Sequence, residues 1–274
     1  MGKGLTLKKI AFIGGGAMAE AIIKGIISSG FISGAAIAVG EHTSQRCVYL
    51  EENYGVKAYT DNNKAVEDAD LVILAVKPQV APVALTAELT SHFKKDAWVL
   101  SIMGSVSIDM LHGYVPGFPV VRTMPNTPLA VGEGMTAVCC DDKVTDEMLE
   151  TACAIFGCCG EVEVVAESAI EAITAISGCG PGYAFVIIDA LADAGVRAGL
   201  PRALAIKLAA QTLAGSGKMC IKTGTHPAQL RDQVTSPGGT TIAGIHALEN
   251  HGVRGAFYDA VQAVLQRSNE LQGK

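Results

Sequence analysis

Two short stretches of the sequence carry residue types and spacings that could bind anions. The first, TSPGGTTIAG at residues 235–244, places hydroxyl side chains, a proline and two glycines in front of an apolar helical pattern. Hydroxyls and free backbone N–H groups at a helix start can hold a carboxylate or a phosphate. The second, FIGGGAMAEA at residues 12–21, places Gly14, Gly15 and Gly16 between an apolar run and another helical pattern. Both stretches therefore indicate small anionic ligands.

The glycine-rich turn fits a dinucleotide site. Gly14 and Gly16 match the first two glycines of the G-x-G-x-x-G pattern, and Ala19 stands in third place, where only a small residue is needed. Gly14 would make the tight turn and Gly16 would let the backbone approach a pyrophosphate, while the N-terminus of the following helix supplies positive potential. This strand–turn–helix context predicts a bound dinucleotide.

The end of the second expected strand leaves the choice between NADH and NADPH open. Glu41 follows residues 36–40 and could accept hydrogen bonds from both ribose hydroxyls, which would favour NADH. Thr43, Ser44 and Arg46 follow at once and could hold a 2′-phosphate, although Arg46 could also be a solvated helix residue. The two interpretations point in opposite directions.

Composition narrows the class of protein. The chain has 274 residues, of which 49% are apolar and 18% charged, as in a globular protein with one or two domains. A net charge of −6 argues against a broad nucleic-acid surface. The apolar stretch from Tyr183 to Leu191 is interrupted by Asp189 and is read as too short to span a membrane.

The eight cysteines form no C-x-x-C pair, so we expect free thiols and no metal site.

The elements that must position these motifs change in type along the chain. Up to about residue 165, expected strands alternate with expected helices, which predicts an α/β domain with a doubly wound, mostly parallel sheet. After residue 167 only helices are expected. The strands are expected at 9–13, 36–39, 71–76, 98–103, 120–123, 135–140 and 162–165, and the helices at 18–29, 45–52, 80–93, 145–156, 169–177, 182–198, 201–220, 227–233, 241–250 and 253–270.

Two of the C-terminal helices lack a polar face. Residues 183–194 and 204–213 are apolar nearly all round, broken only by Asp189, Asp193, Lys207 and Gln211. A helix that is apolar on every side must be buried on every side. About a hundred residues cannot easily enclose two such helices, so a second subunit is the expected cover, with a compact monomeric bundle as the alternative.

Taken together, the motifs resemble the pyrroline-5-carboxylate reductase family over nearly the whole chain. The resemblance is carried by seven features in order: FIGGGAMA at 12–19, Asn63, AVKP at 75–78, PNTP at 125–128, ISGCGPGYAF at 176–185, DALADAGV at 189–196 and SPGGTT at 236–241. It implies an N-terminal Rossmann-type domain over residues 1–166, followed by an all-helical domain for substrate binding and dimerisation over residues 167–274. The implied activity is reduction of L-1-pyrroline-5-carboxylate to L-proline with NADPH or NADH.

The resemblance also implies roles for individual residues. The residues it places at the cofactor are Ile13, Gly14, Gly15, Gly16, Ala17, Met18, Asn63, Ala75, Val76, Lys77, Pro78, Ile102, Met103 and Gly104, with Glu41 added from the strand end. It places Glu167, Gly238, Gly239, Thr240 and Thr241 at the substrate. Thr241 is the candidate catalytic residue, since its hydroxyl could bond the ring nitrogen or the carboxylate. Glu167 would hold the substrate loop or stabilise positive charge.

Two positions depart from the family pattern. Glu41 stands where relatives often carry a small hydroxyl residue, and Gln233 replaces an asparagine that can reach the cofactor in relatives. A β-hydroxyacid dehydrogenase is an alternative with the same layout, but it needs a lysine on the first long C-terminal helix, and residues 180–198 contain none. A non-catalytic dinucleotide sensor is a second alternative, which would need no SPGGTT pocket.

The N-terminal residues favour the cytoplasm. MGKGLTLKKI runs directly into a strand without a signal-peptide pattern. Gly2 and Thr6 match the loose pattern for N-myristoylation, and whether Gly2 is acylated stays open. We therefore expect a cytoplasmic homo-oligomer whose other partner is a small cyclic imino acid, without nucleic acid or membrane.

Overall fold

The computed structural model describes residue 5 and residues 7–271, which form two compact units. Gly2 and Thr6, the residues of the acylation pattern, lie outside the described part. The first unit runs to Gly178 and takes up the chain again from Arg267, and the second comprises Cys179–Gln266. Each unit is described by itself below.

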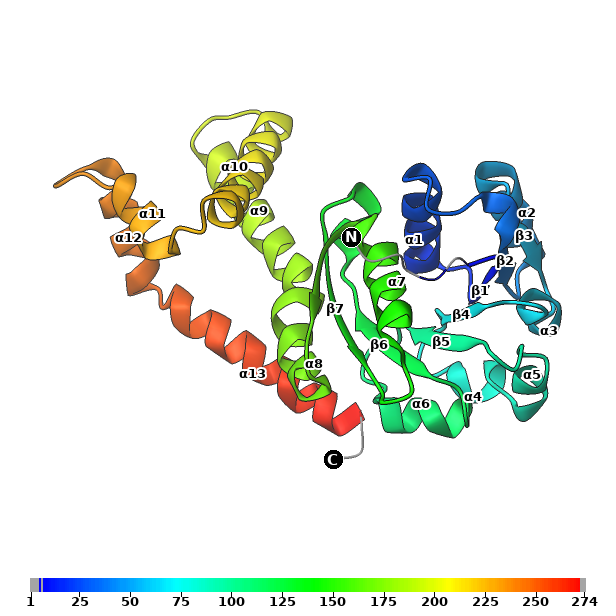
Figure 1. The fold of residues 1–274 in the computed structure, drawn as a ribbon. Helices are drawn as coiled ribbons and strands as arrows, with labels where there is room; N and C mark the ends of the chain where they lie inside the picture. The colour runs from blue at the N-terminus through cyan, green and yellow to red at the C-terminus, as the bar shows by residue number, and fades with distance from the viewer. Residues whose placement is uncertain (1–4, 6, 272–274) are drawn as a thin grey trace. The chain divides into compact units, whose positions relative to one another are not determined.

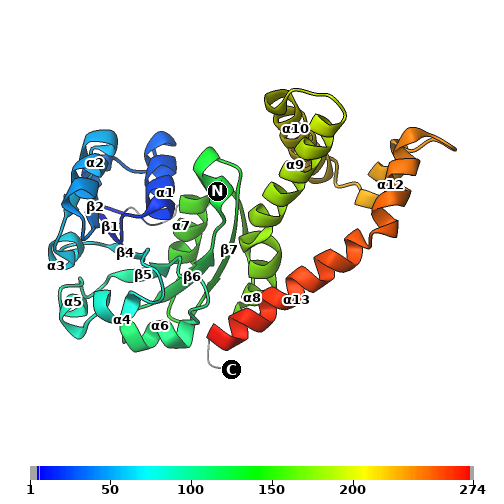
Figure 2. The ribbon, with the colours of Figure 1, turned by 180° about the vertical axis from the view of Figure 1, so that it is seen from behind.

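The first unit is built on one eight-stranded sheet with the order β3-β2-β1-β4-β5-β6-β7-β8. Neighbouring strands are parallel except β6 and β7, which pair antiparallel. The strands are β1 (Ile10–Ile13), β2 (Ile37–Gly40), β3 (Lys57–Tyr59), β4 (Leu71–Leu74), β5 (Trp98–Ser101), β6 (Val120–Met124), β7 (Gly134–Cys140) and β8 (Gly160–Val164). The predicted doubly wound α/β architecture is confirmed, and its colour gradient can be followed in Figures 1 and 2.

Helices cover both faces of this sheet. Residues of α1, α2 and α7 pack on one face, and residues of α3, α4, α5, α6 and α8 on the other. The central strands β1 and β4 read IAFI and LVIL and are buried along their whole length, as expected when helices cover both sides of a parallel sheet. The helices are α1 (Ala17–Ser28), α2 (Ser44–Tyr54), α3 (Asn62–Val66), α4 (Ala81–Ala84), α5 (Ala87–Ser91), α6 (Ile108–Tyr114), α7 (Asp146–Gly157) and α8 (Ile170–Ile173).

One strand and two α-helices of this unit were not expected, and one expected helix is divided. The strand β3 and the helices α3 and α6 are short and carry no long apolar pattern. The helix expected over residues 80–93 is two helices, because Leu85 leaves helical geometry and Thr86 starts a new helix. The Thr86 hydroxyl accepts the N–H of Leu89 at 3.2 Å, a typical N-cap bond.

The second unit is helical, as expected. It contains α9 (Gly180–Arg197), α10 (Arg202–Thr223), α11 (Pro227–Gln233), α12 (Thr240–Asn250) and most of α13 (Val253–Leu271). Its only buried side chains among the described residues are Ala192, Ala205 and Ala209. Large apolar side chains stay exposed, among them Phe185 at 63% and Val186 at 70%. This unit does not bury its own apolar surface.

The structure changes one argument about membranes. Helical turns run on from Glu167 to Arg197, a stretch of 31 residues with a hydropathy of 1.4. By length and composition alone that stretch could cross a bilayer, because it is longer than the apolar segment at Tyr183–Leu191 considered from the sequence. The same test is passed by helices of soluble proteins, and it is weak support for a membrane span.

Candidate functional site

The segments expected to bind a dinucleotide meet at one edge of the sheet. They follow the carboxyl ends of β1, β2, β4 and β5, and the strand order reverses direction between β1 and β4. Ligands of open α/β sheets bind in the crevice outside the strand ends at such a reversal. The loop after β1 therefore lies where a dinucleotide is expected.

The three glycines of this loop meet different surroundings. Gly14 has φ of +101°, and a Cβ there would lie 2.7 Å from the carbonyl oxygen of Ala75. A Cβ on Gly15 would lie 2.8 Å from the Leu50 side chain, whereas one on Gly16 would meet nothing within 4 Å. Gly14 and Gly15 are needed by the fold itself. Gly16 is the N-cap of α1 and faces open space, which leaves room for a ligand against the helix N-terminus.

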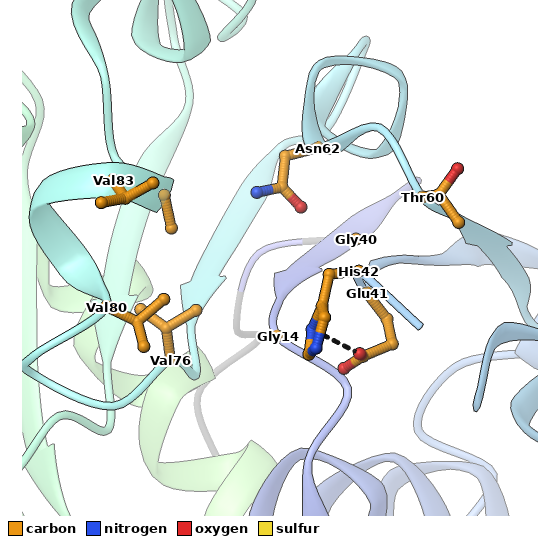
Figure 3. Close-up of a pocket in the computed structure, with 10 residues that line it drawn as sticks. Gly14, Gly40, Glu41, His42, Thr60, Asn62, Val76, Val80 and Val83 are labelled. Carbon is orange, nitrogen blue, oxygen red and sulfur yellow. Dashed lines mark ion pairs between the residues drawn. The ribbon is translucent and has the colours of Figure 1, made fainter. Parts of the chain in front are cut away.

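A cavity of about 230 Å³ opens beside this loop. Figure 3 shows Glu41 and His42 on one side of it and Val76, Val80 and Val83 on the other. One wall is thus polar and acidic and the opposite wall is apolar, as suits a ribose and an adenine ring. The lining residues are Gly14, Gly40, Glu41, His42, Thr60, Asn62, Val76, Val80, Val83 and Ala84.

Glu41 is held in place by backbone donors. Its Oε2 accepts the N–H of Gly15 at 3.1 Å, and its Oε1 accepts the N–H of Thr43 at 3.0 Å. The Nδ1 atom of His42 lies 2.9 Å from the same Oε1. The carboxylate thus links the glycine loop to the start of α2.

Arg46, on α2, also contacts the glycine loop after β1. Its Nε donates to the carbonyl of Gly15 at 2.8 Å, and its guanidinium also bonds the Glu20 carboxylate. Glu20 accepts the hydroxyls of Tyr49 at 3.0 Å and of Tyr54 at 2.6 Å as well. The bond to the Glu20 carboxylate raises the pKa of Tyr54. This group fastens α1 to α2.

The remaining residues that were predicted to bind the cofactor lie at the same edge of the sheet. Ile13 ends β1, and Ala17 and Met18 begin α1. Ala75, Val76, Lys77 and Pro78 follow β4, and the N–H of Ala75 donates to the carbonyl of Ile13 at 2.8 Å. Ile102, Met103 and Gly104 follow β5.

The sequence did not indicate several residues that line the cavity. Asn62 lines it, while the neighbouring Asn63 donates its N–H to Asp61 at 3.0 Å in the first turn of α3. A Cβ on Gly40 would collide with the Asn62 side chain, so these two residues pack together. Thr60 and His42 also line the cavity. Thr60 follows the strand β3, and Asn62 begins the helix α3. Because neither element was expected from the sequence, neither residue was expected at the cavity.

Glu167 belongs to the first unit and lies in an ion-pair group. Its Oε1 accepts Nη1 of the buried Arg122 at 2.9 Å and the N–H of Ile108 at 2.7 Å. Nη2 of Arg122 donates to Glu171 at 2.9 Å, and Glu171 also accepts the hydroxyl of Ser268. Glu167 thereby holds the start of α6, which follows the loop containing Ile102–Gly104.

SPGGTT forms a turn and a helix start in the second unit. The N–H of Gly239 donates to the carbonyl of Ser236 at 2.9 Å, and Gly238 has φ of +69°. With Pro237 before Gly238, this is the pattern of a type II turn. The N–H of Gly239 is therefore used within the turn.

The two threonines after this turn are open to ligands. Gly239 is the N-cap of α12, and Thr240 and Thr241 are exposed in its first turn. Their hydroxyls have no hydrogen-bond partner among the described residues, so neither acts as a side-chain cap. A cavity of about 550 Å³ beside α12 is lined by Gly238 and Gly239 but not by Thr240 or Thr241.

The cysteines are buried or half-buried thiols. All eight are free. Burial raises the pKa of Cys139 to about 12 and that of Cys159 to about 11, so both thiols stay protonated at neutral pH. Among the residues that the structure describes, no group of three or more His, Cys, Asp or Glu side chains could hold a metal ion.

Comparison with known proteins gives consistent matches along the chain. A family model described as pyrroline-5-carboxylate reductase dimerisation matches residues 167–271, and one described as NADP oxidoreductase, coenzyme F420-dependent, matches residues 9–105. Pyrroline-5-carboxylate reductase of Synechocystis sp. is 44% identical over 266 residues, covering 97% of this chain and 99% of the relative. The dimerisation match begins at residue 167, whereas the compact units part after Gly178, so the domain boundary after residue 166 stays a prediction.

Solved structures agree with the sequence relatives. A pyrroline-5-carboxylate reductase from Coxiella burnetii is 35% identical, with a TM-score of 0.88, over 97% of this chain and 99% of that one. The pyrroline carboxylate reductase of Plasmodium falciparum, solved with NADP bound, is 31% identical, with a TM-score of 0.85, over 96% and 98% of the two chains.

Proposed function

The chain belongs to the pyrroline-5-carboxylate reductase family, and we propose how its residues reduce L-1-pyrroline-5-carboxylate to L-proline with NADPH or NADH. The observation that carries this conclusion is the 44% identity to a reductase along 97% of the chain. The glycine loop at the carboxyl edge of the sheet supports it independently, because its open face at Gly16 suits a pyrophosphate.

Reduction of a cyclic imine needs little chemistry from the side chains. The nicotinamide supplies a hydride to the ring carbon of the C=N bond, and the ring nitrogen ends protonated. A protonated imine is already a strong electrophile, so the protein mainly has to hold the ring in the right orientation and exclude water. The cofactor would be held by the segments after β1, β2, β4 and β5, whose geometry fits a dinucleotide.

The start of α12 is our candidate for holding the substrate carboxylate. The first N–H groups of a helix have no partner within the helix and favour an anion. Because Gly239 uses its N–H within the turn, the donors left include the N–H groups of Thr240 and Thr241 and their hydroxyls. Gly238 and Gly239 would shape the turn. Thr241 would bond the carboxylate or the ring nitrogen and pass a proton.

Glu167 would act on the substrate side through the chain rather than by direct contact. Its bonds to Arg122 and Ile108 support a role in fixing the loop after β5. The Lys that a β-hydroxyacid dehydrogenase needs has no counterpart on α9, which carries no lysine. That alternative is therefore disfavoured.

We further propose a homodimer or larger homo-oligomer formed through the C-terminal helices, working in the cytoplasm. The dimerisation match over residues 167–271 supports the association, and the exposed apolar side chains of α9 and α10 need a cover. Free cysteines suit a reducing compartment. An oligomer interface also accounts for the apolar exterior of the long helical stretch without a membrane.

A steady-state assay tests the reaction. Purified protein should oxidise NADH or NADPH only when pyrroline-5-carboxylate is added, and mass spectrometry should detect L-proline in equal amount. Oxidation of a 3-hydroxy acid with NAD⁺ or NADP⁺ in place of this reaction would support the dehydrogenase alternative. Binding of the dinucleotide without any turnover would support a sensor.

A further inference from the structure

We propose that this chain prefers NADH to NADPH and that Glu41 is the residue that sets the preference. The inference rests on the proposed function, because it concerns the ribose end of the same cofactor site. The sequence left the choice open between Glu41 on one side and Thr43, Ser44 and Arg46 on the other. The structure shows what Glu41, the N–H of Thr43 and the Arg46 guanidinium already bind.

Glu41 presents a fixed acceptor to the cavity. Its side chain is 10% exposed and is fastened by the N–H groups of Gly15 and Thr43. A carboxylate has about four acceptor positions, so at least one stays available beside these two donors and the His42 ring. A carboxylate at the end of the second strand accepts hydrogen bonds from ribose hydroxyls. A 2′-phosphate has no hydroxyl to donate to the Glu41 carboxylate. It would also place a negative charge next to the negative charge of that carboxylate.

Two of the donors that a 2′-phosphate could use are engaged elsewhere. The N–H of Thr43 is bonded to Glu41, so an anion already takes this donor at the start of α2. The Arg46 guanidinium bonds the Gly15 carbonyl and the Glu20 carboxylate and lies 4.9 Å from the Tyr49 ring centre. Arg46 therefore supports the glycine loop and does not line the cavity.

One basic side chain remains at the cavity. Of the residues that line it, His42 alone can carry a positive charge, and its Nδ1 faces the Glu41 carboxylate. Any positive charge on His42 is thus balanced by Glu41 before a phosphate arrives. Because two like charges would then stand a few ångströms apart, we expect NADH to bind about tenfold to hundredfold more tightly than NADPH. The NADP in the Plasmodium falciparum relative does not decide the matter for this chain.

Binding titrations with the whole protein test the proposal without turnover. Calorimetry would measure Kd for NADH and NADPH, and for ADP-ribose and 2′-phospho-ADP-ribose, which share the ribose end but cannot transfer hydride. The wild-type protein should favour the unphosphorylated member of each pair. Glu41→Ser should shift the ratio at least about tenfold toward the phosphorylated member. Glu41→Gln keeps the side-chain length and an acceptor, and should shift the ratio in the same direction if the serine variant does not fold.

Two further variants separate the local contact from general charge effects. Glu52→Gln removes one negative charge from the exposed side of α2, so it should leave the ratio unchanged. Arg46→Gln should weaken NADH and NADPH equally, because it loosens the loop that both would use. Equal or tighter NADPH binding by the wild type, an unchanged ratio in both Glu41 variants, or loss of NADPH alone in Arg46→Gln would each overturn the proposal. Binding of neither dinucleotide would instead refute the proposed cofactor site, and this inference with it.

Discussion

The backbone N–H of Ile108 donates to the carboxylate of Glu167 at 2.7 Å. Ile108 is the first residue of α6, while Glu167 follows β8, so two segments far apart in the sequence are fastened at one point. Arg122, whose side chain is 4% exposed, forms an ion pair with the same carboxylate. This contact fixes the end of the loop that begins after β5.

Glu167→Ala should lower stability. The change leaves the N–H of Ile108 without its acceptor and removes one of the two partners of Arg122, which costs about 2 kcal/mol of unfolding free energy. Urea unfolding measures the loss, with Glu150→Ala on the exposed side of α7 as the control. Glu167→Gln, which keeps an acceptor, should recover part of it. Unchanged stability together with a raised KM for pyrroline-5-carboxylate would indicate direct substrate contact instead.

Gly16→Val should abolish dinucleotide binding while the melting temperature stays near that of the wild type. A side chain at Gly16 meets no protein atom, but it would stand where the pyrophosphate is expected. Gly14→Ala is the matched comparison and should destabilise the fold, since Gly14 has φ of +101° and lies against the Ala75 carbonyl. Undiminished NADH and NADPH affinity in Gly16→Val would refute the assignment of this loop.

Thr241→Ala should damage catalysis and leave stability alone. Its hydroxyl has no hydrogen-bond partner among the described residues, so the folded chain loses little with it. Loss of one hydrogen bond to a charged substrate group would lower kcat/KM about tenfold to hundredfold. The control is Thr223→Ala, which removes a hydroxyl that donates to the carbonyl of Met219 and accepts the N–H of Thr225. A lower melting temperature with wild-type kinetics would show that Thr241 is merely structural.

Val186→Glu should break the oligomer. Val186 is 70% exposed on α9 in the single chain, and a carboxylate there would be buried without a partner if a second subunit covers this face. Light scattering should give a multiple of 28.3 kDa for the wild type and a smaller mass for the variant. Val48→Glu on α2, where the valine is 50% exposed, should leave the mass unchanged. A wild-type protein that is monomeric and fully active would refute the association.

Asp70→Asn should make the unfolding free energy depend less on pH in the acidic range. Burial alone would raise the pKa of Asp70, but bonds from the Lys94 ammonium and the N–H groups of Lys8 and Lys9 outweigh it and hold the pKa below its usual range. A carboxylate with a lowered folded pKa stabilises the fold above its unfolded pKa of about 3.9 and loses that contribution as the pH falls through the folded value.

Chemical denaturation between roughly pH 5 and pH 2 would measure this effect. The wild type should lose more unfolding free energy over that range than Asp70→Asn. Asp142→Asn, at an exposed position, should follow the wild-type curve. A variant curve parallel to that of the wild type would contradict the role of Asp70.

Long apolar patterns made most of the fold predictable. The strands β1 and β4 and the helices α1 and α7 were expected within a residue or two of their bounds, because their buried faces dominate their composition. The strand β3 reads KAY and is partly exposed, so it shows no such pattern. The split between α4 and α5 depends on one hydroxyl cap at Thr86, which an apolar periodicity does not reveal.

The parts of the candidate site that depend on backbone conformation could be predicted from the sequence. The glycine loop and the SPGGTT turn depend on residue types that permit unusual backbone angles, and Gly14 and Gly238 do have positive φ. The partners of side chains were beyond sequence reasoning. The bond of Arg46 to the Gly15 carbonyl spans 31 positions and depends on how α1 and α2 pack. The pairing of Glu167 with Arg122 spans 45 positions and depends on the whole sheet.

Ser268, which is synthesised late, contacts residues of the first unit that are synthesised early. It is 5% exposed, lies 3.4 Å from the Ser105 hydroxyl and donates to Glu171, so residues near the end of the chain complete the first unit. A ribosome makes the sheet first, yet the Glu171 carboxylate beside Arg122 must wait about a hundred residues for this partner. A nascent chain halted before α13 therefore lacks the side chain that contacts both the loop after β5 and α8. Folding of the first unit is therefore complete only after α13 has been synthesised.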